Sequence, residues 1–411
     1  MILRYQKYEI RPERAEREIQ RFIQLIGHAE WQKKLKNTND VAKSAHSVYY
    51  LKYLLERNPF LTPLVHYYDL INRGEPIKRH VKGDIAWLFS MCLTINRIHH
   101  NLTPKGRKVL YGRLSSDDLR ALLLEIDVAV HYLQNSEDVQ FNDIEELETF
   151  NGRKYDFLVT LPTIGRVEIE SKWISPDAGR KIRRDAFCSF ADILLKTFER
   201  FSAKCIVDIR LRSGRLSKNK TFLESISKSI IERYEAGSTE FDHGDNVSIK
   251  IKRLPNETQI RNDQEARDIV KQYYSPRAHF AISSGDNHTI LIIAESEEQD
   301  SILDSIYNNL KDASTQLSGE RPSIIACAIE GINSQQLEDL FEESALRLMT
   351  GSYFSNKARR HIWKITYLSD LTMESDSTGK TRPKRTSLSW DNPRFNEELF
   401  VNNNVDSSNE R

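Results

Sequence analysis

The sequence has few cysteines and no long apolar run. Its four cysteines, Cys92, Cys188, Cys205 and Cys327, are far apart and form no CxxC pair. This spacing disfavours a zinc ribbon and a disulfide framework, and it is typical of a reducing compartment. The N-terminus has no apolar segment like that of a signal peptide, and the most apolar helical stretch, 85–95, is far too short to span a bilayer. We therefore expect a soluble cytoplasmic protein with no membrane partner.

Motifs for nucleotide hydrolysis and for sequence-specific DNA reading are also missing. The chain has no GxxxxGK[ST] stretch, so any ATPase or helicase acting with it would be a separate partner. No helix-turn-helix or zinc-finger pattern is evident. The net charge of +1 excludes a uniformly basic surface but is compatible with a local basic groove.

The length and the element pattern predict an α/β multidomain protein. With 411 residues, 39% hydrophobic and 29% charged, the chain is globular and long enough for two or three domains. Residues 1–113 have apolar residues at helical spacing and predict an N-terminal helical domain. Residues 114–215 predict a central α/β core with the order helix, three strands, helix, strand. Residues 216–372 predict a C-terminal α/β region, and 373–411 a mobile polar tail.

The most informative stretch is YDFLVTLPTIGRVEIESKWIS, residues 155–175, which predicts two strands around a turn. Because strand side chains alternate between faces, Glu168, Glu170 and Lys172 share one face. The apolar residues between them point to the other face. A short hairpin that lines one face with two carboxylates and an ammonium indicates either surface decoration or a metal site.

The loop predicts how the two strands pair. A turn at 163–165 that ends in glycine suits a type I turn with a bulge. In that register Asp156 stands opposite Lys172 and Leu158 opposite Glu170, all on one face. A slip of one residue would turn Asp156 away.

Carboxylates crowded in this way favour a divalent cation. Two carboxylates a few ångströms apart raise each other's pKa unless a cation lies between them. Hard oxygen ligands suit Mg²⁺, and Mn²⁺ as a substitute. Lys172, on the same strand face, would serve an attacking water and stabilise developing negative charge. Glu168 is either a further ligand or a peripheral, solvent-facing residue, and we favour the second interpretation.

The pattern Asp156, thirteen intervening residues, then Glu170-Ser171-Lys172 resembles the D…(D/E)xK motif of the PD-(D/E)XK nuclease superfamily. The predicted element order of the central core also resembles that superfamily's restriction-endonuclease-like fold. The resemblance implies that Asp156, Glu170 and the Ser171 carbonyl bind the metal and that Lys172 serves the attacking water. Some members add a glutamate from the first core helix, and Glu125 is the matching residue. Residue 155 is tyrosine where many members have proline.

A basic cluster follows the hairpin. Arg180, Lys181, Arg183 and Arg184 lie in what the pattern predicts as the first turns of a helix, where cations oppose the helix dipole. A phosphate backbone that approaches the metal would explain them. The alternative is a solvated face balanced by neighbouring aspartates.

Two functions remain open at this stage. The first is a Mg²⁺-dependent endonuclease acting on DNA, with RNA as an alternative substrate. Its architecture resembles bacterial restriction or phage-defence effectors, and two cuts in a duplex would favour a homo-oligomer. The second is a catalytically inactive scaffold that keeps the nuclease fold and binds nucleic acid or protein.

Overall fold

The computed structural model divides into two compact units. The first comprises Met1–Leu35, Arg57–Pro176 and Leu303–Arg411, and the second comprises Lys36–Glu56 and Asp177–Ile302. The structure describes residues 11–44, 48–134, 138–145, 153–175, 179–198, 201, 203–217, 219–255, 260, 263–274, 278–285, 288–330, 337–338, 344–369, 372–375, 381–384, 386–396 and 400.

Helices form the N-terminal part of the chain, as the sequence predicts. They are α1 (Ala15–Ile26), α2 (His28–Ser44), α3 (Val48–Arg57), α4 (Leu61–Asn72), α5 (Gly83–Asn101) and α6 (Pro104–Leu114). Phe22, Trp31 and Phe60 are fully buried and stack at centroid distances of 4.7–6.1 Å, so the aromatic side chains here are core residues. These helices do not form a separate domain, because most of them belong to the same compact unit as the sheet that follows.

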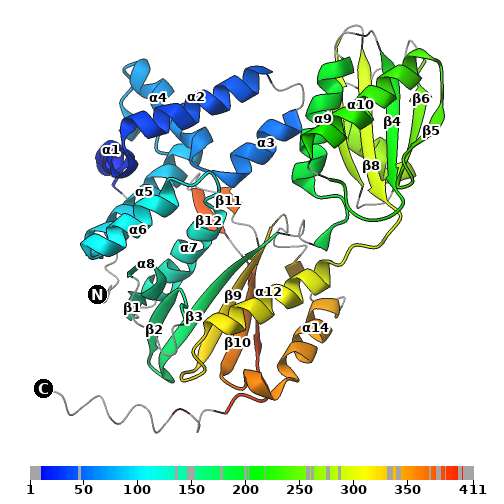
Figure 1. Cartoon of the computed structure of the whole chain (residues 1–411). Helices are drawn as coiled ribbons and strands as arrows, with labels where there is room; N and C mark the ends of the chain where they lie inside the picture. Colours follow the sequence, from blue (N-terminus) through cyan, green and yellow to red (C-terminus); the bar gives the residue numbers. More distant parts are fainter. Residues whose placement is uncertain are drawn as a thin grey trace, which may run out of the picture. The chain divides into compact units, whose positions relative to one another are not determined.

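The first unit contains a six-stranded sheet with strand order β1-β2-β3-β9-β10-β13 (Figure 1). The strands are β1 (Asp138–Phe141), β2 (Phe157–Leu161), β3 (Gly165–Ile174), β9 (Ser323–Ile329), β10 (Ile362–Leu368) and β13 (Ser387–Asp391). β1, β2 and β3 pair antiparallel, β9 runs parallel to β3, β10 runs parallel to β9, and β13 is antiparallel to β10. Every residue of β9 is buried, as expected for a parallel strand inside a covered sheet.

Helices cover both faces of this sheet. They are α7 (Arg120–Gln134), α12 (Ile302–Gln316) and α14 (Ala345–Phe354), and a short α8 (Asn142–Glu145) follows β1. On one face Trp173 of β3 lies under Arg120 of α7, with the guanidinium 5.9 Å from the ring centroid. On the other face Lys172 contacts Gln316 at the end of α12. Successive side chains of a strand point to opposite faces, so α7 and α12 sandwich the sheet.

The central core predicted for residues 114–215 needs a correction. The predicted helix and strand exist as α9 (Arg184–Phe198) and β4 (Lys204–Leu211), but β4 lies in a different sheet of the second unit. The chain leaves the first unit after β3 and returns to it as α12 and β9. The return begins about 130 residues after the end of β3. α12 and β9 take the places that the sequence assigned to α9 and β4. The predicted region 216–372 is likewise divided between the two units.

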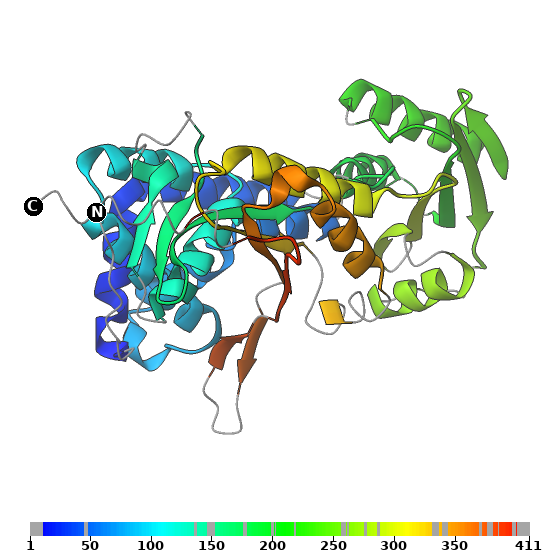
Figure 2. The same ribbon diagram turned by 90° about the horizontal axis from the view of Figure 1, so that it is seen from below.

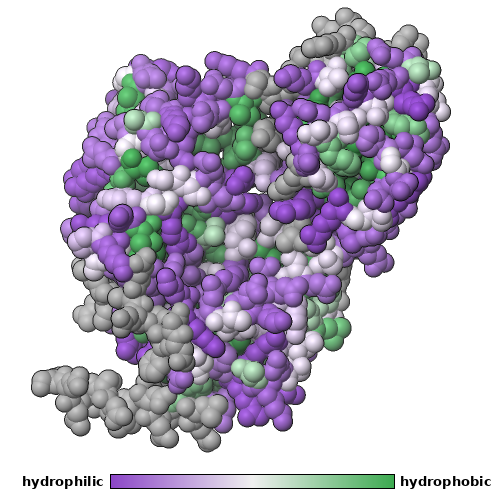
Figure 3. Space-filling model, viewed as in Figure 1, coloured by the Kyte–Doolittle hydropathy of each residue, from purple (hydrophilic) through white to green (hydrophobic). Residues whose placement is uncertain are grey.

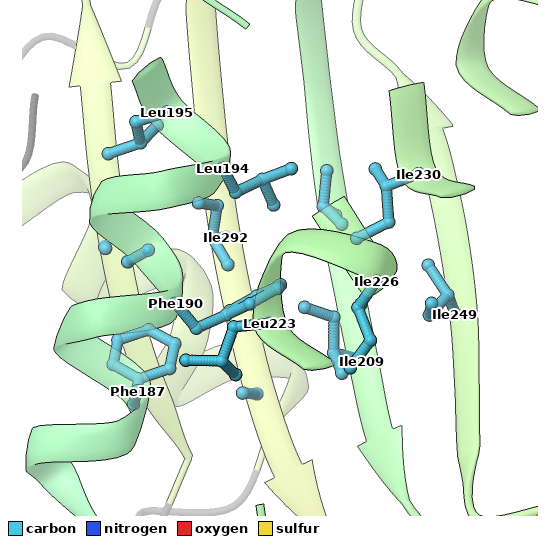
Figure 4. Close-up of a cluster of buried hydrophobic side chains, with 14 of the residues drawn as sticks. Phe187, Phe190, Leu194, Leu195, Ile209, Leu223, Ile226, Ile230, Ile249 and Ile292 are labelled. Atoms are coloured by element: carbon cyan, nitrogen blue, oxygen red, sulfur yellow. The ribbon is translucent and has the colours of Figure 1, made fainter. Parts of the chain in front are cut away.

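The second unit has a five-stranded sheet with strand order β5-β6-β4-β8-β7. Its further elements are α10 (Lys220–Glu235), β5 (Glu240–His243), β6 (Val247–Arg253), α11 (Asp263–Tyr273), β7 (His279–Ser284) and β8 (Thr289–Ser296). β4 and β8 are parallel, and the other neighbours are antiparallel. Phe190, Leu194, Ile226 and Ile292 belong to the large buried cluster between the sheet and helices α9 and α10 (Figure 4). The second unit therefore has its own hydrophobic core.

The segment predicted as a mobile tail contributes ordered structure. β13 is the edge strand of the six-stranded sheet, and its Trp390 packs edge-on against Tyr367. β11 (Thr372–Ser375) and β12 (Thr381–Lys384) form a separate two-stranded ribbon that projects from the sheet (Figure 2). Phe400 is buried and stacks on Phe395. The prediction of a mobile tail is therefore wrong for these residues, and residues 401–411 lie outside the described part.

Hydrophilic residues predominate on the face of the molecule visible in Figure 3. Among the described residues the exposed large hydrophobic side chains are Ile71, Tyr273, Leu303 and Leu348, each on a different helix. Scattered apolar residues of this kind are ordinary on a protein surface. Within the described helices, none combines the length and apolar character needed to cross a bilayer.

Candidate active site

The β2–β3 hairpin brings Asp156 opposite Glu170. Phe157 pairs with Ile169 and Leu161 with Gly165, and the Asp156 N–H extends the ladder by donating to the Ile169 carbonyl at 3.1 Å. The predicted register was therefore two residues out, because the three-residue turn lies at 162–164, one residue earlier than expected. A slip of two residues keeps every side chain on its predicted face. It also brings Asp156, the residue just before β2, alongside Glu170 and Ser171 of β3.

The site lies beside the part of β3 after Ile169, which β2 does not pair with. Asp156 Oδ2 accepts a 2.6 Å hydrogen bond from the backbone N–H of Ser171. In an extended strand the N–H and C=O of one residue point to the same side, so the Ser171 carbonyl also faces Asp156 rather than β9. The Asp156 carboxylate and the Ser171 carbonyl therefore lie together at this edge of β3, next to Glu170.

Lys172 is fixed by two partners. Its Nζ lies 2.6 Å from Glu170 Oε1, and it also donates to the side-chain oxygen of Gln316. Gln316 is the last residue of α12, which returns from the second unit to the first. The ammonium group is therefore held beside Glu170 by an element that lies far away in sequence.

Glu125 on α7 also belongs to the site. It is buried and forms an ion pair with Arg113, the guanidinium of which also lies 3.3 Å from Asp143 of α8. The charge of Glu125 acts on both Asp156 and Glu170. The structure thus brings the predicted helix glutamate to the predicted carboxylates, but with an arginine as its direct partner.

Burial governs the protonation of these groups. It raises the pKa of Glu170 to about 7, despite the opposing charge of Lys172. It also raises the pKa of Asp156 well above its ordinary value, and the nearby Glu125 and Glu170 add to the effect. Burial lowers the pKa of Lys172, but Glu170 more than offsets this, so the lysine pKa is raised. The site has an excess of buried negative charge that a further cation would relieve.

The donor set fits a hard divalent cation. Glu170 Oε2 is buried and has no hydrogen-bond partner among the described residues. In the described part of the chain no three His, Cys, Asp or Glu side chains are grouped so that they could hold a metal ion. The available ligands are thus Asp156, Glu170 and the Ser171 carbonyl. Mg²⁺ commonly uses one or two carboxylates and takes its remaining ligands from water and phosphate, so this set is sufficient.

Glu168 is a structural residue rather than a solvent-facing one. It is fully buried, and its carboxylate accepts hydrogen bonds from the N–H and Oγ of Ser318 at 2.8 and 2.5 Å. Arg321 lies 3.5 Å away. The expectation that Glu168 faces solvent was wrong, because the turn after α12 covers it. Both carboxylate oxygens accept from Ser318, so Glu168 anchors that turn to β3.

The basic cluster belongs to the second unit and mostly precedes α9, which begins only at Arg184. The prediction that it occupies the first turns of a helix was therefore wrong. Lys181 pairs with Glu298, Arg183 with Asp185 at 3.6 Å, and Arg184 with Glu56 at 2.5 Å. Arg180 lines a cavity of about 170 Å³ together with His279. Acidic partners within the second unit thus account for three of the four cations.

Arg113, Asp143 and Gln316 were missed from the sequence. Arg113 lies in the last turn of α6, where a basic residue carries no particular signal. Gln316 lies 144 positions from its partner Lys172. Only Asp143, in the acidic stretch after β1, carried a signal. Comparisons with protein-family models, curated proteins and solved structures found no match.

Proposed function

We propose that the protein is a Mg²⁺-dependent nuclease that hydrolyses phosphodiester bonds in DNA. The observation that carries the proposal is the hydrogen bond from the Ser171 N–H to Asp156, which holds this carboxylate next to Glu170, with Lys172 Nζ 2.6 Å from the Glu170 carboxylate. Buried carboxylates beside an open strand edge, with an ammonium group on the same face, are the parts that phosphodiester hydrolysis needs.

In this proposal Asp156, Glu170 and the Ser171 carbonyl hold the metal ion. When bound, Mg²⁺ would polarise the phosphate and stabilise the negative charge that develops on it. The hydrogen bond from the Ser171 N–H fixes the orientation of Asp156. Burial of Asp156 and Glu170 strengthens each electrostatic interaction between these groups.

Lys172 would orient the attacking water and stabilise negative charge in the transition state. Because its pKa is raised, it acts as a cation and hydrogen-bond donor rather than as a general base. Gln316 holds the ammonium group in place from α12. Glu125 would contribute its charge from α7 without becoming a direct ligand, since Arg113 already pairs with it.

The element order supports the same function. α7, β1, β2, β3, α12 and β9 follow one another as helix, three strands, helix and strand, if the second unit is treated as an insertion between β3 and α12. This order resembles the PD-(D/E)XK core. Such a core with added domains is typical of restriction or phage-defence effectors, which gives the proposed cellular context. The half-buried cations of the basic cluster at 180–184 would contact DNA phosphates by exchanging their acidic partners for them.

A second candidate is a binding scaffold with the same fold and no catalysis. Retention of the aspartate, glutamate and lysine in one site speaks against it, because a scaffold has no chemical need for a buried carboxylate oxygen without a partner.

The deciding experiment is a cleavage assay on supercoiled and linear DNA with Mg²⁺. We expect activity that is lost with a chelator and in Lys172→Ala. Calorimetric titration with Mn²⁺ distinguishes the scaffold, which would show no binding dependent on Asp156 and Glu170. Activity indifferent to both the chelator and the substitution would refute this mechanism.

A further inference from the structure

The charges of the candidate site balance with a single divalent ion. Its four carboxylates, Glu125, Asp143, Asp156 and Glu170, carry a formal charge of −4 when ionised, and its two cations, Arg113 and Lys172, carry +2, which leaves −2. One Mg²⁺ ion balances the remaining charge of −2. Four carboxylates without the arginine would instead leave −3, enough to attract a second ion.

Arg113 lies between two of these carboxylates. Its two terminal nitrogens pair with different carboxylates, one with Glu125 and the other with Asp143 at 3.3 Å. Burial lowers the pKa of Arg113, but Glu125 more than offsets this, and Asp143 and Asp156 raise the pKa further. A planar fork that bridges two carboxylates is the geometry that arginine favours and lysine cannot reproduce.

Neighbouring contacts hold this arginine in position. Arg113 lies in the last turn of α6, and the start of that helix is tied to α8 because Glu145 accepts a hydrogen bond of 2.9 Å from the Thr103 N–H. Gly106 allows the close approach, since a Cβ there would lie 2.9 Å from the Glu145 carboxylate carbon. α6 and α8 are thus joined at two points, one of which is the Arg113–Asp143 pair.

We propose that Arg113 is a built-in cation that takes the place of a second metal ion, so that the site binds one divalent ion at Asp156 and Glu170. This inference rests on the proposed metal site and adds its stoichiometry. Arg113 is a positioning residue here, because it holds Glu125 and Asp143 away from the metal. Its removal should free these two carboxylates as ligands for a second ion.

The test counts bound Mn²⁺ on the full-length, DNA-free protein at a pH above the Glu170 pKa of about 7. Isothermal titration gives the stoichiometry, and the electron paramagnetic resonance signal of free Mn²⁺ gives an independent count. We expect about one ion in the wild type and about two in Arg113→Gln. The double variant Arg113→Gln/Glu125→Gln should return to about one.

The matched control is Arg120→Gln. Arg120 also lies between two carboxylates of the first unit, Asp118 at 2.6 Å and Glu330. Asp118 keeps Arg57 at 3.2 Å as a second partner, so this variant should still bind about one ion.

Each outcome has a distinct meaning. Two ions in the wild type, or a single ion in folded Arg113→Gln, would overturn the inference. If Arg113→Gln does not fold, Glu125→Gln decides, because loss of the ion in that variant would show that Glu125 is itself a ligand. A wild type that binds no ion through Asp156 and Glu170 would instead reject the proposed function.

Discussion

Asp156 is fixed to the backbone of the residue that separates Glu170 from Lys172. Its Oδ2 atom accepts a 2.6 Å hydrogen bond from the Ser171 N–H, at the edge of β3 that β2 no longer covers. A charge-assisted hydrogen bond of this length offsets part of the cost of burying a carboxylate. The two acidic residues of the candidate site are therefore coupled through the strand itself, so a change at either one should be read as a change in the pair.

Glu170→Gln should abolish cleavage and leave the fold intact. The amide is nearly isosteric with the carboxylate, and its oxygen can still accept from Lys172, so the metal-free melting temperature should stay equal or rise slightly. Because a neutral ligand binds Mg²⁺ weakly, the variant should not gain the wild-type stabilisation, about 2.7 kcal/mol when Mg²⁺ is at 100 times its Kd. Differential scanning fluorimetry with and without Mg²⁺ measures this. Wild-type cleavage by the variant would reject the site.

Glu168→Gln is the matched control and should behave in the opposite way. Glu168 is on the same face of β3 and is fully buried, but it accepts hydrogen bonds from Ser318 instead of facing the open edge. Loss of a charged acceptor for these donors should cost about 1–3 kcal/mol of unfolding free energy. We expect a lower melting temperature with Mg²⁺ binding preserved. Equal loss of metal binding in both variants would show that the two residues are not functionally distinct.

The metal-free protein should lose stability as the pH rises toward neutrality. Burial raises the pKa of Glu170 to about 7 from an ordinary 4.5, so between these values the folded state binds more protons than the unfolded chain. Stability falls with rising pH wherever the folded state binds more protons. The stability that protonated Glu170 gives to the folded state is therefore fully present below about pH 4.5 and is lost as the pH passes 7. Urea denaturation across this range measures the slope.

Mg²⁺ should reverse that dependence, because metal ligation requires the ionised carboxylates. Stabilisation by Mg²⁺ should therefore grow as the pH rises through 7. In Glu170→Gln both the metal-free slope and the Mg²⁺ effect should shrink. An unchanged slope in that variant would assign the titration to other groups.

Local sequence patterns predicted the positions of the candidate residues more accurately than they predicted the domain boundaries. The alternation of β3 placed Glu170 and Lys172 on one face, and this held even though the register was two residues out. Glu125, the helix glutamate that the nuclease resemblance implied, likewise lies close enough for its charge to act on Asp156 and Glu170. Each of these inferences depends on the geometry of one element or one hairpin, which neighbouring residues determine.

The division into units could not be read in the same way. α9 and β4 have the pattern of a core helix and strand, and nothing local distinguishes them from α12 and β9. Which helix–strand pair completes the sheet beside β3 depends on long-range packing between residues more than 100 positions apart, such as Lys172 and Gln316. The missed contacts of Arg113 span only 12 and 30 positions, but they depend on how three separate helices, α6, α7 and α8, pack together.

Phe190→Ala should destabilise the second unit without affecting the candidate site. Phe190 is buried in the core of that unit, and such a truncation typically costs about 3–5 kcal/mol. The four buried cysteines report on each unit, because Cys188 and Cys205 lie in the second and Cys92 and Cys327 in the first. In urea, thiol labelling followed by peptide mass spectrometry should detect Cys188 and Cys205 of the second unit at lower denaturant concentration in the variant. Cys92 and Cys327 of the first unit should keep their wild-type midpoint. Stabilisation by Mg²⁺ should persist for Cys327. A common shift of all four cysteines would mean that the two units unfold as one, and the insertion would then be an integral part of the nuclease core.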